Sequence, residues 1–230
     1  VGANDSTGDV LTQIRLPSGR QGINYDFGEL LPGSIAGRVM VDTDGNCIVD
    51  AVGDRYLQGV TVQLLDSNGV VIRTTTTDAG GNYRFDDLPM GTYAVREVQP
   101  SGLLQAGQRA GSGGGDASQT DLISQIVVGA GVALVNYDFC EIPPSEISGN
   151  VYVDTDQDCI RDADEAPIAG VIITLLDQDG NVVGTTQTDA NGQYKFTGLR
   201  PGNYTVRELQ PNGYFQGGQK AGSGGGNDTV

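Results

Sequence analysis

Residues 82–97 read NYRFDDLPMGTYAVRE, and the same pattern returns at residues 193–208 as QYKFTGLRPGNYTVRE. Over the longer segments 82–116 and 193–227, 20 of 35 aligned positions are identical without a gap. Apolar or aromatic residues alternate with polar ones in both copies, which is the period of a half-buried β-strand. The chain is therefore a tandem repeat with a period of about 111 residues, built from strands.

A second match sets the boundaries of the repeats. Asn24–Phe27 and Asn136–Phe139 both read NYDF, so residues 1–31 are expected to be the terminal strands of a preceding repeat. Residues 33–140 then form one complete repeat, and residues 145–230 form a second repeat that lacks its last strands. Two arrangements fit: a longer covalent array, or identical subunits joined head to tail by donation of the N-terminal strands. The longer array is favoured, because long arrays of one repeat are common.

Seven short strands are predicted in the complete repeat, each a β-branched or alternating run between turn residues. They are Ile35–Val41, Val60–Leu65, Val70–Thr76, Tyr83–Phe85, Tyr93–Val98, Leu122–Val128 and Ala133–Phe139. Turns such as Asp66–Gly69 place Gly where a positive φ is expected. No stretch has the period of an amphipathic helix, so the fold class is all-β, with tandem β-sandwich domains.

Composition and charge exclude several functions. The 230 residues contain no His, which removes Ser-His-Asp, Cys-His and His-zinc chemistry. The formal net charge of −16 opposes binding to nucleic acid, because phosphate recognition depends on Lys and Arg. No apolar run approaches the roughly 18 residues of a membrane span. Cations are the expected partners of so acidic a chain.

An acidic loop follows the first strand of each repeat. In the second repeat, residues 154–165 place oxygens at positions 1, 3, 5, 9 and 12, with a main-chain carbonyl available at position 7. This is the ligand spacing of a calcium-binding EF-hand loop. The predicted ligands are Asp154, Asp156, Asp158, Ile160, Asp162 and Glu165.

The first repeat carries a weaker form of the same loop. Its predicted ligands are Asp42, Asp44, Asn46, Ile48, Asp50 and Asp54. Asp54 comes one residue late, and both loops have Cys where the EF-hand has Gly at position 6. We expect Ca²⁺ in both loops, with lower affinity in the first, and prefer Ca²⁺ to Mg²⁺ because Mg²⁺ demands stricter octahedral geometry. The alternative is a solvated acidic loop without a metal.

The motifs together carry a resemblance. Val-x-Val-Asp-x-Asp, Leu-Leu-Asp, Thr-Asp-x-x-Gly-x-Tyr-x-Phe, Gly-x-Tyr-x-Val-x-Glu and Gln-Pro-x-Gly occur in order across the two repeats. This series resembles the B-type repeats of serine-aspartate-repeat surface proteins and their collagen-adhesin relatives. The resemblance implies a prealbumin-like or immunoglobulin-like β-sandwich, calcium in the acidic loop, and a stalk or spacer in an exported protein.

One property of the related pilin and adhesin modules is not expected here. In those modules an isopeptide bond can join a Lys of the first strand to a late Asn or Asp. The first strands of this chain contain no Lys, and the two lysines are Lys195 and Lys220. Glu97 and Glu208, which match the acid of the motif, are therefore expected to be structural rather than catalytic.

The three cysteines allow one pairing prediction from geometry. In a tandem sandwich the first strand and the last strand must both reach the end of the domain that faces the next repeat. Cys47 follows the first strand and Cys140 follows the last one, so we predict a disulfide between them, which would stabilise by roughly 4 to 5 kcal/mol. Cys159 needs a partner beyond residue 230, or stays free if strands are donated, since residues 1–31 hold no Cys. Three reduced thiols are the alternative.

These features favour an extracellular, non-enzymatic structural array rigidified by calcium, acting as a stalk, fibre or filament. An adhesin whose repeats bind a host protein or glycan directly is the alternative, and a carboxylate-pair hydrolase is disfavoured because the acids cluster at metal-ligand spacing and Trp is absent. Asn4, Asn203 and Asn227 stand in Asn-x-Ser/Thr triplets and are candidates for glycosylation.

Overall fold

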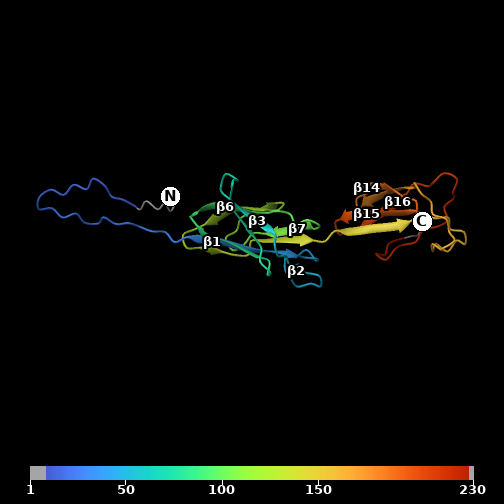
Figure 1. Cartoon of the computed structure of the whole chain (residues 1–230), viewed down its shortest axis with the longest axis horizontal. Helices are drawn as coiled ribbons and strands as arrows, with labels where there is room; N and C mark the ends of the chain where they lie inside the picture. The colour runs from blue at the N-terminus through green and yellow to red at the C-terminus, as the bar shows by residue number, and fades with distance from the viewer. Residues whose placement is uncertain (1–8, 228–230) are drawn as a thin grey trace. The chain divides into compact units, whose positions relative to one another are not determined.

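The computed structural model describes residues 9–227 and divides into two compact units between Pro143 and Pro144 (Figure 1). Every regular element in the described residues is a β-strand, as the sequence predicts. The described residues contain no helix that could cross a membrane.

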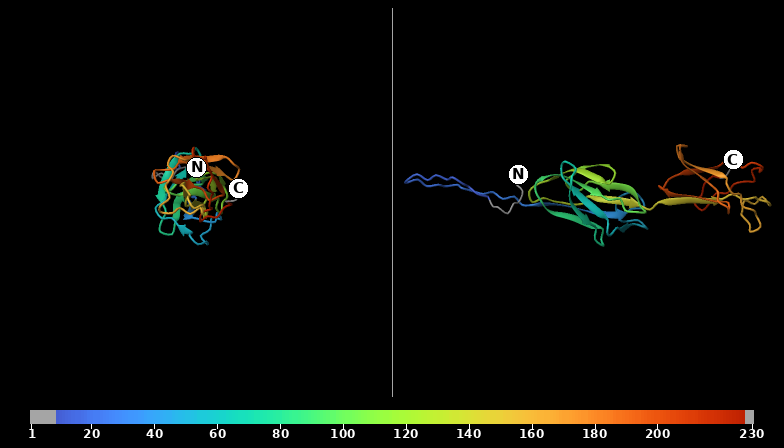
Figure 2. Two further views of the ribbon diagram at one scale, coloured as in Figure 1. Left: turned by 90° about the vertical axis from the view of Figure 1, so that its right-hand side faces the viewer. Right: turned by 45° about the horizontal axis from the view of Figure 1, so that its top comes forward.

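The first unit is a sandwich of two sheets (Figures 1 and 2). One sheet has the order β10-β1-β11-β7, with β2 and β5 also paired to β1, and the other has the order β4-β3-β6-β9-β8. The strands are β1 Gly33–Val41, β2 Arg55–Tyr56, β3 Thr61–Leu65, β4 Val71–Thr76, β5 Asn82–Leu88, β6 Gly91–Glu97, β7 Leu104–Arg109, β8 Asp116–Gln119, β9 Leu122–Val128, β10 Ala133–Leu134 and β11 Asp138–Ile142.

Alternating side chains from both sheets form the core of the first unit. In β5, Tyr83, Phe85 and Leu88 are buried while the residues between them are exposed. They pack with buried residues of β1, β3, β6, β9 and β11 in one hydrophobic cluster. The inner-face alternation that the sequence shows is therefore the packing that holds the two layers together.

The first and last strands of this unit lie side by side and run in the same direction. Met40 of β1 is registered with Cys140 of β11. β10 and β11 both pair with the edge of β1 that lies opposite β5 and β2, and between them the Tyr137 amide donates to Ala36 O at 3.2 Å. The hydroxyl of buried Tyr83, on β5, donates to Tyr137 O at 2.6 Å, which ties the segment between β10 and β11 to the strand on the other edge of β1.

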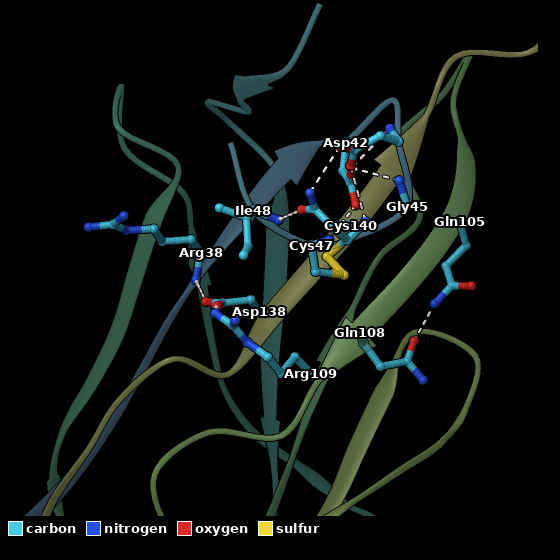
Figure 3. Close-up of a disulfide and its surroundings, with 12 residues drawn as sticks. Arg38, Asp42, Gly45, Cys47, Ile48, Gln105, Gln108, Arg109, Asp138 and Cys140 are labelled. Atoms are coloured by element: carbon cyan, nitrogen blue, oxygen red, sulfur yellow. Dashed lines mark hydrogen bonds and ion pairs between the residues drawn. A yellow bond between two sulfur atoms is a disulfide. The ribbon is translucent and has the colours of Figure 1, made fainter. Parts of the chain in front are cut away.

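A disulfide joins the loop after β1 to β11 (Figure 3). Cys47 and Cys140 are bonded at 2.07 Å between sulfurs, with their Cα atoms 5.6 Å apart. This is the pairing that strand direction predicts, because β1 and β11 are parallel and end together. Beside it, Arg109 of β7 forms an ion pair of 2.5 Å with Asp138 of β11. Cys159 is not bonded to another cysteine.

The second unit repeats part of this architecture. It contains a pair β12-β15 and a three-stranded sheet β14-β13-β16. The strands are β12 Ser145–Asn150, β13 Ile172–Asp177, β14 Val182–Gln187, β15 Gln193–Leu199 and β16 Tyr204–Glu208. Its smaller core centres on Ile173, Leu175 and Phe196. These strands are the counterparts of β1, β3, β4, β5 and β6.

Three strands of the first unit were not expected from the sequence. β2 and β8 are short, and β7 lies in a Gln- and Gly-containing segment, LQAGQR, without the β-branched residues that mark a strand. β7 forms because its backbone pairs with β11. The predicted strand at residues 133–139 is in fact two, β10 and β11, because residues 135–137 between them do not continue the ladder with β1.

Residues 9–32 contain no strand, although the repeat pattern assigns residues 1–31 to the terminal strands of a preceding repeat. Their apolar side chains are exposed, among them Val10, Ile23, Tyr25 and Phe27. A strand needs a sheet to pair with, and these residues have none in the first unit. The strand assignment of this segment stays a prediction.

Gly37 in the middle of β1 tests the close approach of Tyr137 to this strand. A Cβ atom at this position would lie 1.7 Å from Tyr137 O, which is backbone and cannot move aside cheaply. We expect Gly37→Ala to lower the free energy of unfolding of the first unit by about 2 kcal/mol or more, measured by urea denaturation. Gly28→Ala is the control, because a Cβ there meets no atom within 4 Å. Equal midpoints for the two variants would contradict this account.

The disulfide provides a second test. It closes a loop between residues 93 apart in sequence, so a Cys47→Ala/Cys140→Ala variant is expected to lose about 4 kcal/mol of unfolding free energy. Chemical denaturation of oxidised protein measures this loss, and Cys159→Ala is the matched control because that thiol is free. If the double variant unfolded together with the control, the bond would not contribute as described.

Candidate metal centres in the two acidic loops

Asp42 stands where β1 ends and the first loop begins. Its side chain is fully buried, and its amide donates to Glu141 O of β11 at 2.8 Å. Its carboxylate accepts hydrogen bonds from the amides of Gly45 at 2.9 Å and Cys47 at 2.5 Å (Figure 3). The first predicted ligand therefore curls the loop around itself and holds it at the end of the β1–β11 pair.

Asp54 closes the same loop from its far end. Its carboxylate accepts hydrogen bonds from the Thr43 hydroxyl at 2.7 Å, the Thr43 amide at 2.8 Å and the Ala51 amide at 2.8 Å. The Thr43 hydroxyl, followed by the main-chain amides, lowers the pKa of Asp54 to about 2. Asp54 is thus a carboxylate held in place although it comes one residue later than the EF-hand pattern requires.

The loop brings three of the predicted ligands together. One carboxylate oxygen each from Asp42, Asp44 and Asp54 lie within 4.8 Å of one another. Burial raises the pKa of Asp44, and its contact with Asp42 and the charge of Asp50 act in the same direction. Negative charge is therefore crowded at this point, and a cation would relieve the crowding.

The other predicted ligands of this loop lie beside that cluster. The Asn46 amide group donates to Asp44 at 3.0 Å and to Asp50 at 3.1 Å, while Asn46 Oδ1 accepts from the Ile48 amide at 2.6 Å. Asn46 therefore connects the cluster to Asp50 and does not itself point an oxygen to it. The side chain of Ile48 is exposed.

The second loop gathers the corresponding acids. One oxygen each from Asp154, Asp156 and Glu165 lie within 4.8 Å of one another. Glu165 is buried and accepts from the Thr155 amide at 2.8 Å and the Asp162 amide at 3.1 Å. Asp154 Oδ2 accepts from the Cys159 amide at 3.2 Å, but Oδ1 is buried and has no hydrogen-bond partner.

The remaining predicted ligands of the second loop lie outside this group of three. Asp158 uses a carboxylate oxygen to accept from the Ile160 amide at 2.7 Å. Burial raises the pKa of Asp156, and the charges of Asp158, Asp162 and Glu165 add to this effect. The second loop thus repeats the charge crowding of the first.

The cysteines at loop position 6 adopt the backbone conformation that Gly has in an EF-hand. Cys47 has φ 56° and Cys159 has φ 57°, both in the left-handed region. The departure from Gly that the sequence shows therefore leaves the sharp turn intact. The residues fit calcium by type, since each loop presents three convergent carboxylates and further oxygens nearby.

Sequence reasoning missed one structural role in the loops. Thr43 and Thr155 both occupy loop position 2, and each donates from its amide and its hydroxyl to the last acid of its loop. The recurrence of Thr at this position was the available signal.

Of the asparagines in Asn-x-Ser/Thr triplets, Asn203 and Asn227 are exposed, and Asn4 lies outside the described residues.

The SdrD B-like domain family matches residues 33–139 and 145–229, which are the two repeats. Serine-aspartate repeat-containing protein D of Staphylococcus aureus is 35% identical over 211 residues, which cover 91% of this chain and 16% of that protein. Serine-aspartate repeat-containing protein F of Staphylococcus epidermidis is 37% identical over 178 residues, which cover 77% of this chain and 11% of that protein.

Solved structures are similar only at a low level. A streptococcal ancillary pilin covers 81% of this chain and 56% of its own length, with 20% identity and a TM-score of 0.37. The match to the minor pilin GBS52 of Streptococcus agalactiae covers 81% of this chain and 86% of that pilin, with 17% identity and a TM-score of 0.35. The family match covers both repeats, and the chain belongs to the SdrD B-like domain family.

Proposed function

We propose that this chain is a non-enzymatic segment of an extracellular surface stalk or fibre, and that calcium bound in the two acidic loops rigidifies its repeats. Membership of the SdrD B-like family supports the structural role. The chain spans 16% or less of the relatives named above, so this proposal concerns the repeats and not the binding activity of a whole surface protein.

The observation that carries the calcium proposal is Asp154 Oδ1. A buried carboxylate oxygen without a partner costs free energy unless something replaces the lost water. Asp154 belongs to the group of three acids that also contains Asp156 and Glu165. A hard cation with oxygen ligands would satisfy this atom and offset the repulsion between the three carboxylates.

The position of the first loop supports a structural role for such a cation. Asp42 begins the loop at the end of β1, Asp54 closes it, and Cys47 ties its middle to β11. A cation held between Asp42 and Asp54 would connect the two ends of the loop at the place where the first and last strands stop. The loop would then resist bending where the chain leaves the domain.

Calcium dependence of unfolding tests this proposal. The three acids of each loop converge only in the folded state, so calcium should stabilise that state by mass action, by about 2.7 kcal/mol at 100 times Kd. For a domain of this size this corresponds to a rise in Tm of roughly 10 °C or more. We expect this rise when the 230-residue chain is heated with calcium instead of chelator.

Variants locate the effect in the loops. Asp44→Asn and Asp156→Asn each remove one charge from a loop while keeping its shape, and the double variant should lose most of the rise in Tm. Asp179→Asn, in the exposed turn between β13 and β14, removes the same charge elsewhere and should keep it. A rise in Tm that survives in the double variant, or that is absent from the unchanged chain, would refute calcium binding in the loops.

A further inference from the structure

A second group of acids lies inside the first unit and contains none of the predicted loop ligands. One carboxylate oxygen each from Glu97, Asp121 and Glu141 lie within 4.8 Å of one another. Glu97 is the last residue of β6, Asp121 lies in the turn between β8 and β9, and Glu141 belongs to β11. The three acids therefore come from both sheets of the sandwich and meet between them.

Glu97 differs from the acids of an exposed loop in the burial of its carboxylate. Its side chain is only 2% exposed, and neither of its carboxylate oxygens has a hydrogen-bond partner. Oδ1 of half-buried Asp121 is also buried without a partner. Burial first, then the charges of Glu141 and Asp121, raise the pKa of Glu97 to about 9.

The surroundings hold the group in place without neutralising Glu97. The Glu97 amide donates to Asp121 O at 2.9 Å, which joins β6 to the β8–β9 turn. The Gln99 side-chain amide donates to the Glu141 carboxylate, and Glu141 O accepts from the Asp42 amide at 2.8 Å. The geometry is thus fixed by main-chain contacts, while the Glu97 carboxyl points at two other acids.

We propose that Glu97, Asp121 and Glu141 form a cation site inside the sandwich, which takes a hard divalent cation such as Ca²⁺. Buried acids are normally paired with a cation or coordinate a metal, because an isolated buried charge is costly. Oxygen-only ligands with up to three negative charges suit Ca²⁺, which accepts irregular geometry better than Mg²⁺ does. The bound ion would join the two sheets.

This site is separate from the loop sites of the proposed function. Its ligands lie on β6, β11 and the β8–β9 turn, and none of them is a predicted loop ligand. In the second unit, Glu208 holds the position of Glu97 at the end of β16, but it is exposed and belongs to no such group among the described residues. Glu208 therefore offers a control for any general effect of losing this glutamate.

Counting bound ions tests the site. The 230-residue chain is dialysed against about 1 mM free calcium, the range in which extracellular calcium modules bind, and bound calcium is measured by atomic emission. We expect Glu97→Gln to bind one calcium fewer than the unchanged chain, and Glu208→Gln to bind the same number. Asp121→Asn serves as a second variant and should also lose one ion.

Folding and the loop sites are controlled separately. Glu97→Gln keeps the shape of the side chain, and circular dichroism and thermal unfolding in chelator must show a folded protein; if it fails to fold, Asp121→Asn decides. Adding Glu97→Gln to the Asp44→Asn/Asp156→Asn variant should lower its bound calcium by one ion, even if the loops of that variant bind no calcium. Equal calcium counts for folded Glu97→Gln or Asp121→Asn and the unchanged chain would overturn the site and leave Glu97 as a protonated acid.

Discussion

The pairing of β1 with β11 is the contact on which the rest of the first unit depends. The two strands are parallel, so a crossover connection must join them, and here that connection contains the nine strands β2 to β10. Both strands stop at the same end of the unit. That end collects the acidic loop, the disulfide and Glu141. The loop acids converge there because Asp42 is anchored to β11 through Glu141 O.

Much of this arrangement could be predicted from the sequence, since it depends on local pattern or on chain direction. Alternation identified the long strands, the carboxylate spacing identified Asp42, Asp44 and Asp54 as neighbours, and strand direction identified the partner of Cys47. β7 could not be found, because LQAGQR becomes a strand only through its pairing with β11. The predicted ligands Asn46 and Asp50 lie beside the three-acid group, since hydrogen bonds within the loop decide where such side chains point.

The acids at Glu97, Asp121 and Glu141 show a different limit of sequence reasoning. They are 24 and 20 residues apart along the chain and follow no ligand spacing, so only the meeting of two sheets brings them together. The sequence identifies Glu97 as part of a repeated motif, but the burial of its side chain depends on the strands that follow it. Its copy Glu208 is exposed in a unit where the described strands end at β16.

The contrast between Glu97 and Glu208 also separates two kinds of stabilisation within one repeat. The acidic loops form from one short segment, so each loop has its three acids in place in both units. The group of Glu97, Asp121 and Glu141 draws on β6, the β8–β9 turn and β11, so it forms only in a unit where all three are folded together. A cation in the loop would therefore act on a local turn, whereas a cation at Glu97 would act on the closure of the whole domain, and its binding would report that the last strand is in place.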